Sequence, residues 1–142
     1  MDGSRNLAAL VGRILLALIF VLSGFGKVMN MSGTADFMTH MGIPPGLIYP
    51  AMILSIAVEL GLGLLVVIGF KARVAALLIF LWFIPVTILG HFLPYRAAVA
   101  AGDKMGAMMQ QINFLKNISI MGGLLLIVGF GAGGWSVDGA SD

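Results

Sequence analysis

The sequence predicts an all-α membrane protein, an antiparallel bundle of four transmembrane helices, for three reasons. Of its 142 residues, 60% are hydrophobic and 10% are charged, whereas a soluble domain is about 45–50% apolar and about a quarter charged. A domain of this size cannot bury that excess in its own core, so lipid must be its solvent. Four apolar segments are also long enough for a spanning helix, which needs roughly 20 residues with a range of about 17–25; they lie at positions 7–28, 47–70, 72–93 and 114–130.

The first segment, 7–28, ends at "SGFGK". Arg5 and Arg13 precede an apolar core, so a cleaved signal peptide is an alternative. The segment is long for a signal peptide, Arg13 lies inside it, and "VLSGFG" is a poor cleavage site. We therefore expect a retained spanning helix, with Arg13 snorkelling to the membrane surface. A polar loop, 30–46, follows.

The second and third segments, 47–70 and 72–93, are joined almost directly at "GFKAR", and Pro85 predicts a kink in the third. A longer loop, 94–113, precedes the fourth segment, 114–130. The Gly-rich tail, 131–142, is expected to be frayed. Small residues that allow close helix packing support one membrane domain, 1–142; they are Ala57, Gly61, Gly63, Gly122 and Gly123.

Four spanning helices put both termini on one side of the membrane. The lysines and arginines divide evenly between the two sides, with Arg5, Arg13, Lys71 and Arg73 on the side of the termini and Lys27, Arg96, Lys104 and Lys116 on the other. The short Lys71–Arg73 turn is the clearest signal, because the positive-inside bias acts in short loops. We predict that both termini are cytoplasmic.

Each predicted helix carries one ionisable side chain in the half of the bundle away from the termini: Lys27, Glu59, His91 and Lys116. A carboxylate at mid-membrane costs about 2.5–3.5 kcal/mol, so Glu59 must be paired, protonated or functional. Ser23 lies four residues before Lys27 and shares its helix face, and Asn117 follows Lys116. The pattern predicts a shared polar pocket. The alternatives are a buried ion pair that only fixes helix register, and lysines that snorkel.

Several stretches, in this order and spacing, resemble the DoxX/DoxD family of small four-helix membrane proteins over residues 7–131. They are "SGFGK", "ELGLGLLVVIGF", His91-Phe92 and "NFLKNISIMGG". The resemblance implies a four-helix membrane fold and, in some members, a link to quinone-reducing oxidoreductases. We expect a bacterial inner (plasma) membrane protein. The loop 94–113 and its methionines lie outside the family pattern.

The composition argues against most cofactors. The sequence has no cysteine, which excludes disulfides, thiolate-bound zinc and iron–sulfur clusters, and its two histidines argue against a bis-histidine haem. Its net charge of +2, without a basic run, predicts no nucleic-acid partner. We predict no metal site, although thioether and imidazole groups suit Cu(I). The weak candidates for that ion are Met38, His40, Met41, Met105, Met108 and Met109.

Three functions remain open from the sequence. The first is a membrane subunit of a quinone-linked oxidoreductase, active only with a redox partner, which binds a quinone non-covalently through Ser23, Lys27, Glu59, His91, Lys116 and Asn117. Glu59 and His91 would be the catalytic residues. Glu59 would relay a proton or hold a lysine in place, and a lysine or His91 would donate a hydrogen bond to a quinone carbonyl. The second is a non-catalytic scaffold, anchor or assembly subunit of a membrane complex, and the third is a small-solute or proton carrier. A carrier usually needs paired repeats, so four helices would have to form a homo-oligomer.

Overall fold

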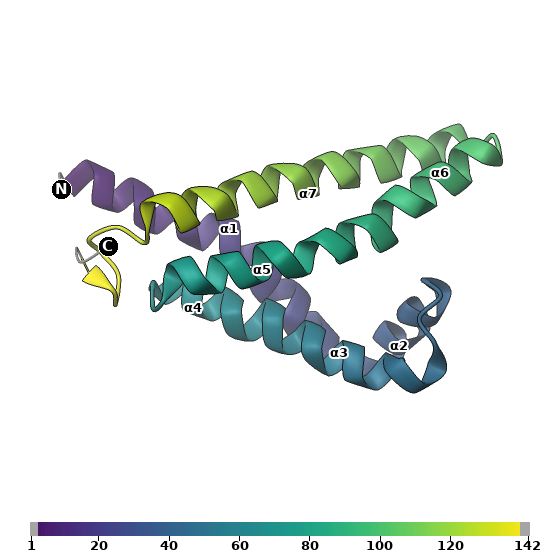
Figure 1. The fold of residues 1–142 in the computed structure, drawn as a ribbon, viewed down its shortest axis with the longest axis horizontal. Coiled ribbons are helices and arrows are strands. Elements are labelled where there is room, and N and C mark those ends of the chain that lie inside the picture. The colour runs from purple at the N-terminus through teal and green to yellow at the C-terminus, as the bar shows by residue number, and fades with distance from the viewer. Residues whose placement is uncertain (1–2, 140–142) are drawn as a thin grey trace.

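The computed structural model describes residues 3–139, and all regular elements among them are helices. Four continuous helical spans are long and apolar enough to cross a membrane: Gly3–Met29, Pro45–Ile68, Ala72–Ala100 and Lys104–Phe130. The chain ends lie together at one end of the molecule (Figure 1). The predicted all-α fold with four spanning helices is therefore confirmed.

The described residues form ten helical elements, nine within the four spans and α2 between the first two spans. They are α1 (Gly3–Met29), α2 (Met31–His40), the 3-10 helix η1 (Pro45–Leu47), α3 (Ile48–Ile56), the π-helix η2 (Ala57–Leu62), α4 (Gly63–Ile68), α5 (Ala72–Thr87), the π-helix η3 (Ile88–Phe92), α6 (Leu93–Ala100) and α7 (Lys104–Phe130).

Two predicted loops are largely helical, so the sequence prediction was wrong there. The loop 30–46 contains α2, whose first turn is capped by Asn30: its side-chain oxygen accepts from the Gly33 N–H at 3.1 Å. The loop 94–113 forms α6 and the first turns of α7, and Asp103 caps α7 through the Gly106 N–H at 2.9 Å. Alanines and glutamine favour a helix in this stretch even though it is too polar to resemble a membrane segment.

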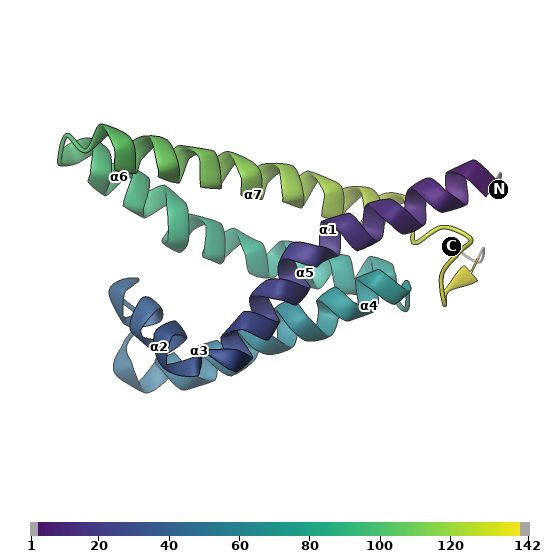
Figure 2. The same ribbon diagram turned by 180° about the vertical axis from the view of Figure 1, so that it is seen from behind.

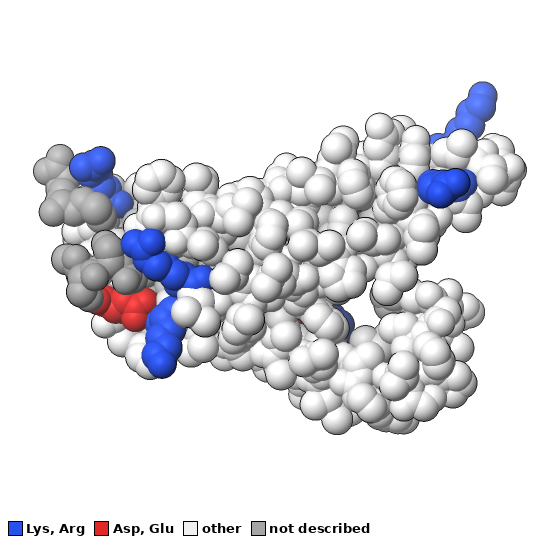
Figure 3. All heavy atoms as spheres, viewed as in Figure 1, with Lys and Arg blue, Asp and Glu red and all other residues white. Residues whose placement is uncertain are grey.

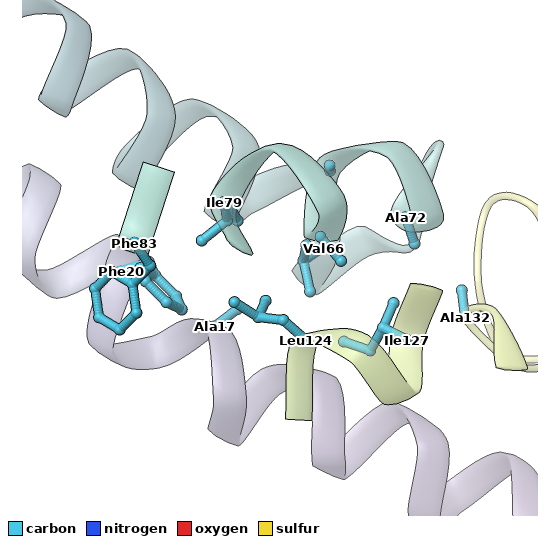
Figure 4. Close-up of a cluster of buried hydrophobic side chains, with 11 residues drawn as sticks. Ala17, Phe20, Val66, Ala72, Ile79, Phe83, Leu124, Ile127 and Ala132 are labelled. Carbon is cyan, nitrogen blue, oxygen red and sulfur yellow. The ribbon is translucent and has the colours of Figure 1, made fainter. Parts of the chain in front are cut away.

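The four spans form two arms that meet at the end holding the termini. In the first arm, α1 packs against α3, η2 and α4; in the second, α7 packs against α5 and α6. The arms diverge toward the opposite end in both views (Figures 1 and 2). The hydrophobic core joins the arms where they meet (Figure 4), and its labelled side chains are Ala17, Phe20, Val66, Ala72, Ile79, Phe83, Leu124, Ile127 and Ala132.

Arg13 holds this closed end together from within. Its side chain is 2% exposed, so the expectation that it snorkels to the membrane surface was wrong. Its guanidinium donates to the carbonyl oxygens of Val66 at 3.2 Å, Val67 at 3.0 Å and Trp135 at 2.6 Å. Two of these carbonyls lie in the last turn of α4, where a helix leaves acceptors unsatisfied and favours a cation. Gly69, with φ +71°, leaves the space that the guanidinium fills.

The tail packs against the same end over residues 131–139, so the expected fraying is not found there; residues 140–142 lie outside the described residues. Asp138 accepts the backbone N–H groups of Lys71 at 2.8 Å and Ala72 at 3.0 Å, which start α5. The Gly134 N–H donates to the Asn6 side chain at 3.0 Å. The tail therefore ties α1, α5 and the α4–α5 turn together.

Glycines set how closely the helices of the first arm approach. A Cβ built on Gly24 would lie 2.7 Å from the Leu60 backbone nitrogen, and one on Gly63 would lie 3.3 Å from Phe20 Cβ. Gly63 was among the predicted packing positions, whereas a Cβ on Gly61 would meet no atom within 4 Å. Gly24 is thus the tightest point between α1 and η2.

We predict that Gly24→Ala lowers the free energy of unfolding by about 1–3 kcal/mol, because the new methyl group would force α1 away from a backbone atom. The melting temperature of the protein in detergent, followed by size-exclusion chromatography, measures the loss. Gly26→Ala is the matched control, since a Cβ there meets open space. Equal melting temperatures for the two variants would contradict the close approach.

Candidate functional site

A cleft of about 390 Å³ lies between the two arms, in the half of the molecule away from the termini. Figure 3 shows a hollow between the arms, with basic side chains at both ends of this face and a mostly uncharged band between them. The lining is mainly apolar and aromatic, and includes Phe20, Phe37, Met38, Trp82, Phe83 and Val86. The rings of Phe20 and Phe83, 5.0 Å apart at 69°, join the arms at the cleft.

The first wall of the cleft, formed by the first arm, is built around an ion pair. Lys27 Nζ lies 2.5 Å from Glu59 Oε2 and also donates to Ser23 Oγ at 2.8 Å. The Ser55 hydroxyl donates to Glu59 Oε1 at 3.1 Å. Glu59 is only 5% exposed, and both of its carboxylate oxygens accept a hydrogen bond. The sequence left open whether Glu59 has a charged partner, and the structure identifies that partner as Lys27.

A π-helical turn presents Glu59 to the cleft. Glu59 lies within η2, between α3 and α4, while Lys27 lies in the last turn of α1. A π turn widens the helix locally, and such turns are frequent at functional sites. The second π-helix, η3, holds His91 in the second arm and follows Pro85, which lacks an N–H to donate.

The second wall, formed by the second arm, carries neutral polar pairs and one lysine. His91 Nδ1 lies 2.9 Å from Gln110 Oε1. Asn117 is buried and donates to Thr87 Oγ1 at 3.1 Å. A lysine completes this wall: Lys116 Nζ donates to Asn113 Oδ1 at 3.1 Å, on the same helix.

The predicted site residues thus share one cleft but form two separate groups. All six line the cavity: Ser23, Lys27, Glu59, His91, Lys116 and Asn117. Among the described residues, the hydrogen bonds of these six join only partners within the same arm. The space between the walls is therefore open to a ligand that contacts both.

Sequence reasoning did not identify two polar groups, one that contacts a cleft residue and one that lines the cleft: Gln110, the partner of His91, and Trp82. Gln110 was placed in a loop, because the helical start of α7 was not recognised. Trp82 lines the cleft, and its indole nitrogen is enclosed without a hydrogen-bond partner among residues 3–139. A tryptophan in an apolar segment gives no signal of its own, since its spacing is that of an ordinary packing residue.

The methionine-rich segments divide between the two arms. Met38 and Met41 line the cleft from the first arm, and Met38 packs with Ile48 and Met52 in a small second core. His40 is exposed, as are Met105, Met108 and Met109 on α7. The described residues contain no group of three or more His, Asp or Glu side chains that could hold a metal ion.

Comparisons with known proteins identify the family of this chain. The family model for DoxX matches residues 8–92, more than half of the chain. The chain belongs to the DoxX family. Among its relatives in Escherichia coli K12, inner membrane protein YqjF is 35% identical over 97% of this chain and 95% of its own length. Inner membrane protein YphA is 33% identical over 95% of this chain and 91% of its own length. No solved structure matches significantly.

The family match includes the first wall and His91, but ends before α7. Lys116 and Asn117 therefore belong to the part of this DoxX protein that the family model does not reach. They come to the cleft through the packing of α7 against α5 and η3.

We predict strong energetic coupling between Lys27 and Glu59. Lys27→Met and Glu59→Gln should each lower the free energy of unfolding by about 2–4 kcal/mol, because each strands a polar partner. The loss of unfolding free energy in the double variant should be smaller than the sum of the two single losses by about 1–3 kcal/mol. Titration with dodecyl sulfate in mixed micelles, followed by circular dichroism, measures all three.

Lys104→Met is the control for these single and double variants, since Lys104 is exposed at the start of α7. It should leave the free energy of unfolding nearly unchanged. Strictly additive losses in the Lys27 and Glu59 variants would show that the pair does not act as a unit.

Proposed function

We propose that this DoxX protein binds the headgroup of a quinone in its cleft, as the membrane subunit of a quinone-linked oxidoreductase. The observation that carries the proposal is the Lys27–Glu59 pair on one wall of an apolar cleft, opposite the polar wall of His91 and Lys116. Apolar pockets with a few convergent polar groups are typical of small-molecule sites. A quinone combines a flat apolar ring with carbonyl acceptors on opposite edges.

Unused hydrogen-bonding capacity on both walls supports this ligand. An ammonium has three N–H donors, and Lys27 uses two of them, toward Ser23 and Glu59. Its third is available to a carbonyl oxygen in the cleft. On the other wall, Lys116 uses one donor, toward Asn113. The ring would lie against the aromatic side chains between the walls.

Glu59 and His91 would relay protons to a bound quinone, each taking up a proton from solvent or from Lys27 before passing it on. The contact of His91 Nδ1 with a carbonyl oxygen of Gln110 assigns the proton to Nδ1, which leaves Nε2 as an acceptor in the neutral ring. Glu59 holds Lys27 in place and exchanges protons with it. The electrons would come from a partner subunit, because the sequence has no cysteine for an iron–sulfur cluster.

We place the protein in a bacterial inner membrane, as its relatives are named. With both termini and the Lys71–Arg73 turn at the cytoplasmic end, the cleft lies in the periplasmic half. A periplasmic or membrane-bound electron donor is the partner that this orientation favours.

Fluorescence of Trp82 tests quinone binding directly, because this indole lines the cleft. The sequence has two tryptophans, so Trp135→Phe isolates the signal. Decyl-ubiquinone and menadione, added in a non-ionic detergent, should quench Trp82 saturably. Lys27→Met should weaken binding about tenfold, the effect of losing a hydrogen bond from a charged donor, whereas Lys104→Met should not.

Trp82→Phe supplies the negative control, since the remaining Trp135 lies in the tail and outside the cleft. The Lys27→Met/Glu59→Gln double variant checks that a stranded carboxylate does not cause the loss. Unsaturable quenching of the same size for both tryptophans would reject a quinone site.

A non-catalytic scaffold or assembly subunit is the second candidate, and one observation favours it. Two polar side chains of the cleft already have partners on neighbouring helices outside it: Asn117 donates to Thr87, and His91 contacts Gln110. Such pairs can serve only to hold helices together. Stable co-purification with partner proteins, unchanged in His91→Ala and without bound quinone, would support this candidate.

A further inference from the structure

The second wall of the cleft carries a positive charge that forms no ion pair with a carboxylate of residues 3–139. On the first wall, Lys27 and Glu59 neutralise each other, and Ser55 occupies the other carboxylate oxygen. Among residues 3–139, the ammonium of Lys116 donates a hydrogen bond only to the neutral side-chain oxygen of Asn113. The ionisable groups that line the cleft therefore sum to one positive charge with His91 neutral.

Other carboxylates in this half of the molecule do not supply the missing partner. Asp36 lies on the exposed face of α2 and makes no ion pair with Lys116. Asp103 is engaged as the cap of α7, where it accepts from the Gly106 N–H. Lys116 thus keeps two donors and its full charge available at the cleft.

A charge in this position affects ligand choice. The cleft is lined mainly by apolar side chains, so an opposite charge brought into it is less screened than in open water. Lys116 is itself exposed, which leaves its ammonium accessible to an entering molecule. A neutral ligand gains a hydrogen bond from Lys116, whereas an anionic ligand gains the hydrogen bond and the charge attraction.

We propose that Lys116 makes the cleft selective for amphiphiles with an anionic oxygen headgroup over neutral ones of the same shape. An ionised hydroxyquinone and a fatty-acid carboxylate share this chemistry. The inference rests on the proposed function in so far as both concern the same cleft. Lys27 supplies the hydrogen bond that any oxygen acceptor can use, and Lys116 adds the preference for charge.

Two matched pairs of probes test the preference by quenching of Trp82 in the Trp135→Phe background. The first pair is 2-hydroxy-1,4-naphthoquinone, which is ionised at neutral pH, and its neutral 2-methoxy analogue. The second pair is 16-doxyl-stearic acid and its methyl ester. In a non-ionic detergent, we expect each anion to bind about fivefold more tightly than its neutral analogue, the upper end for an accessible ion pair.

Substitutions on α7 assign the preference to one side chain. Lys116→Gln should reduce the ratio of the two affinities to about one, and Lys116→Arg should keep it. Lys104→Gln, on the same helix but outside the cleft, should also keep it. Trp82→Phe corrects for binding of the probes elsewhere in the micelle.

The outcomes separate this inference from the quinone proposal. Saturable binding of both naphthoquinones with equal affinity would overturn the anion preference and leave the quinone site standing. A preference dependent on Lys116 for the stearate pair alone would support the anion site and reject the quinone ligand. A preference that survives Lys116→Gln would overturn the role of Lys116.

Discussion

A carboxylate within the hydrocarbon layer must be neutralised, and the contact of Lys27 with Glu59 does this between helices far apart in the sequence. The contact requires α1 to approach η2 closely, and Gly24 permits that approach because it faces the Leu60 backbone. The ion pair with Glu59 holds the ammonium of Lys27, in the last turn of α1, at the point where the arms separate. The fixed first wall of the cleft follows from this one pairing.

The two ends of the molecule are built differently, and this bears on what the protein can do. At the closed end, Arg13 and the tail satisfy the carbonyls of α4 and join three segments of the chain. Toward the other end the arms separate, beyond the apolar contact of Phe20 with Phe83 at the cleft. A cleft that is closed by the packed core at one end suits a binding site better than a carrier, which must open to both sides.

The sequence predicted what hydropathy and the cost of buried charge determine. It located the four spans and predicted that Lys27 and Glu59 face one polar pocket, but it left open whether Lys27, Lys116 or neither pairs with Glu59. It could not show that the bundle opens into two arms, since that depends on which side chains fill the space between helices. It also misjudged Arg13, because its partners are backbone carbonyls, which carry no sequence signal. The extension of α7 was missed because hydropathy cannot distinguish a polar helix from a loop.

The central claim is that the two walls of the cleft enclose one ligand. An experimental structure of the protein with a brominated naphthoquinone tests it most directly, since anomalous scattering locates the bromine without assumptions about the ligand. We predict a bromine peak between the Lys27–Glu59 pair and the wall of His91 and Lys116. An empty cleft at saturating quinone, or arms packed together so that no cleft remains, would contradict this account.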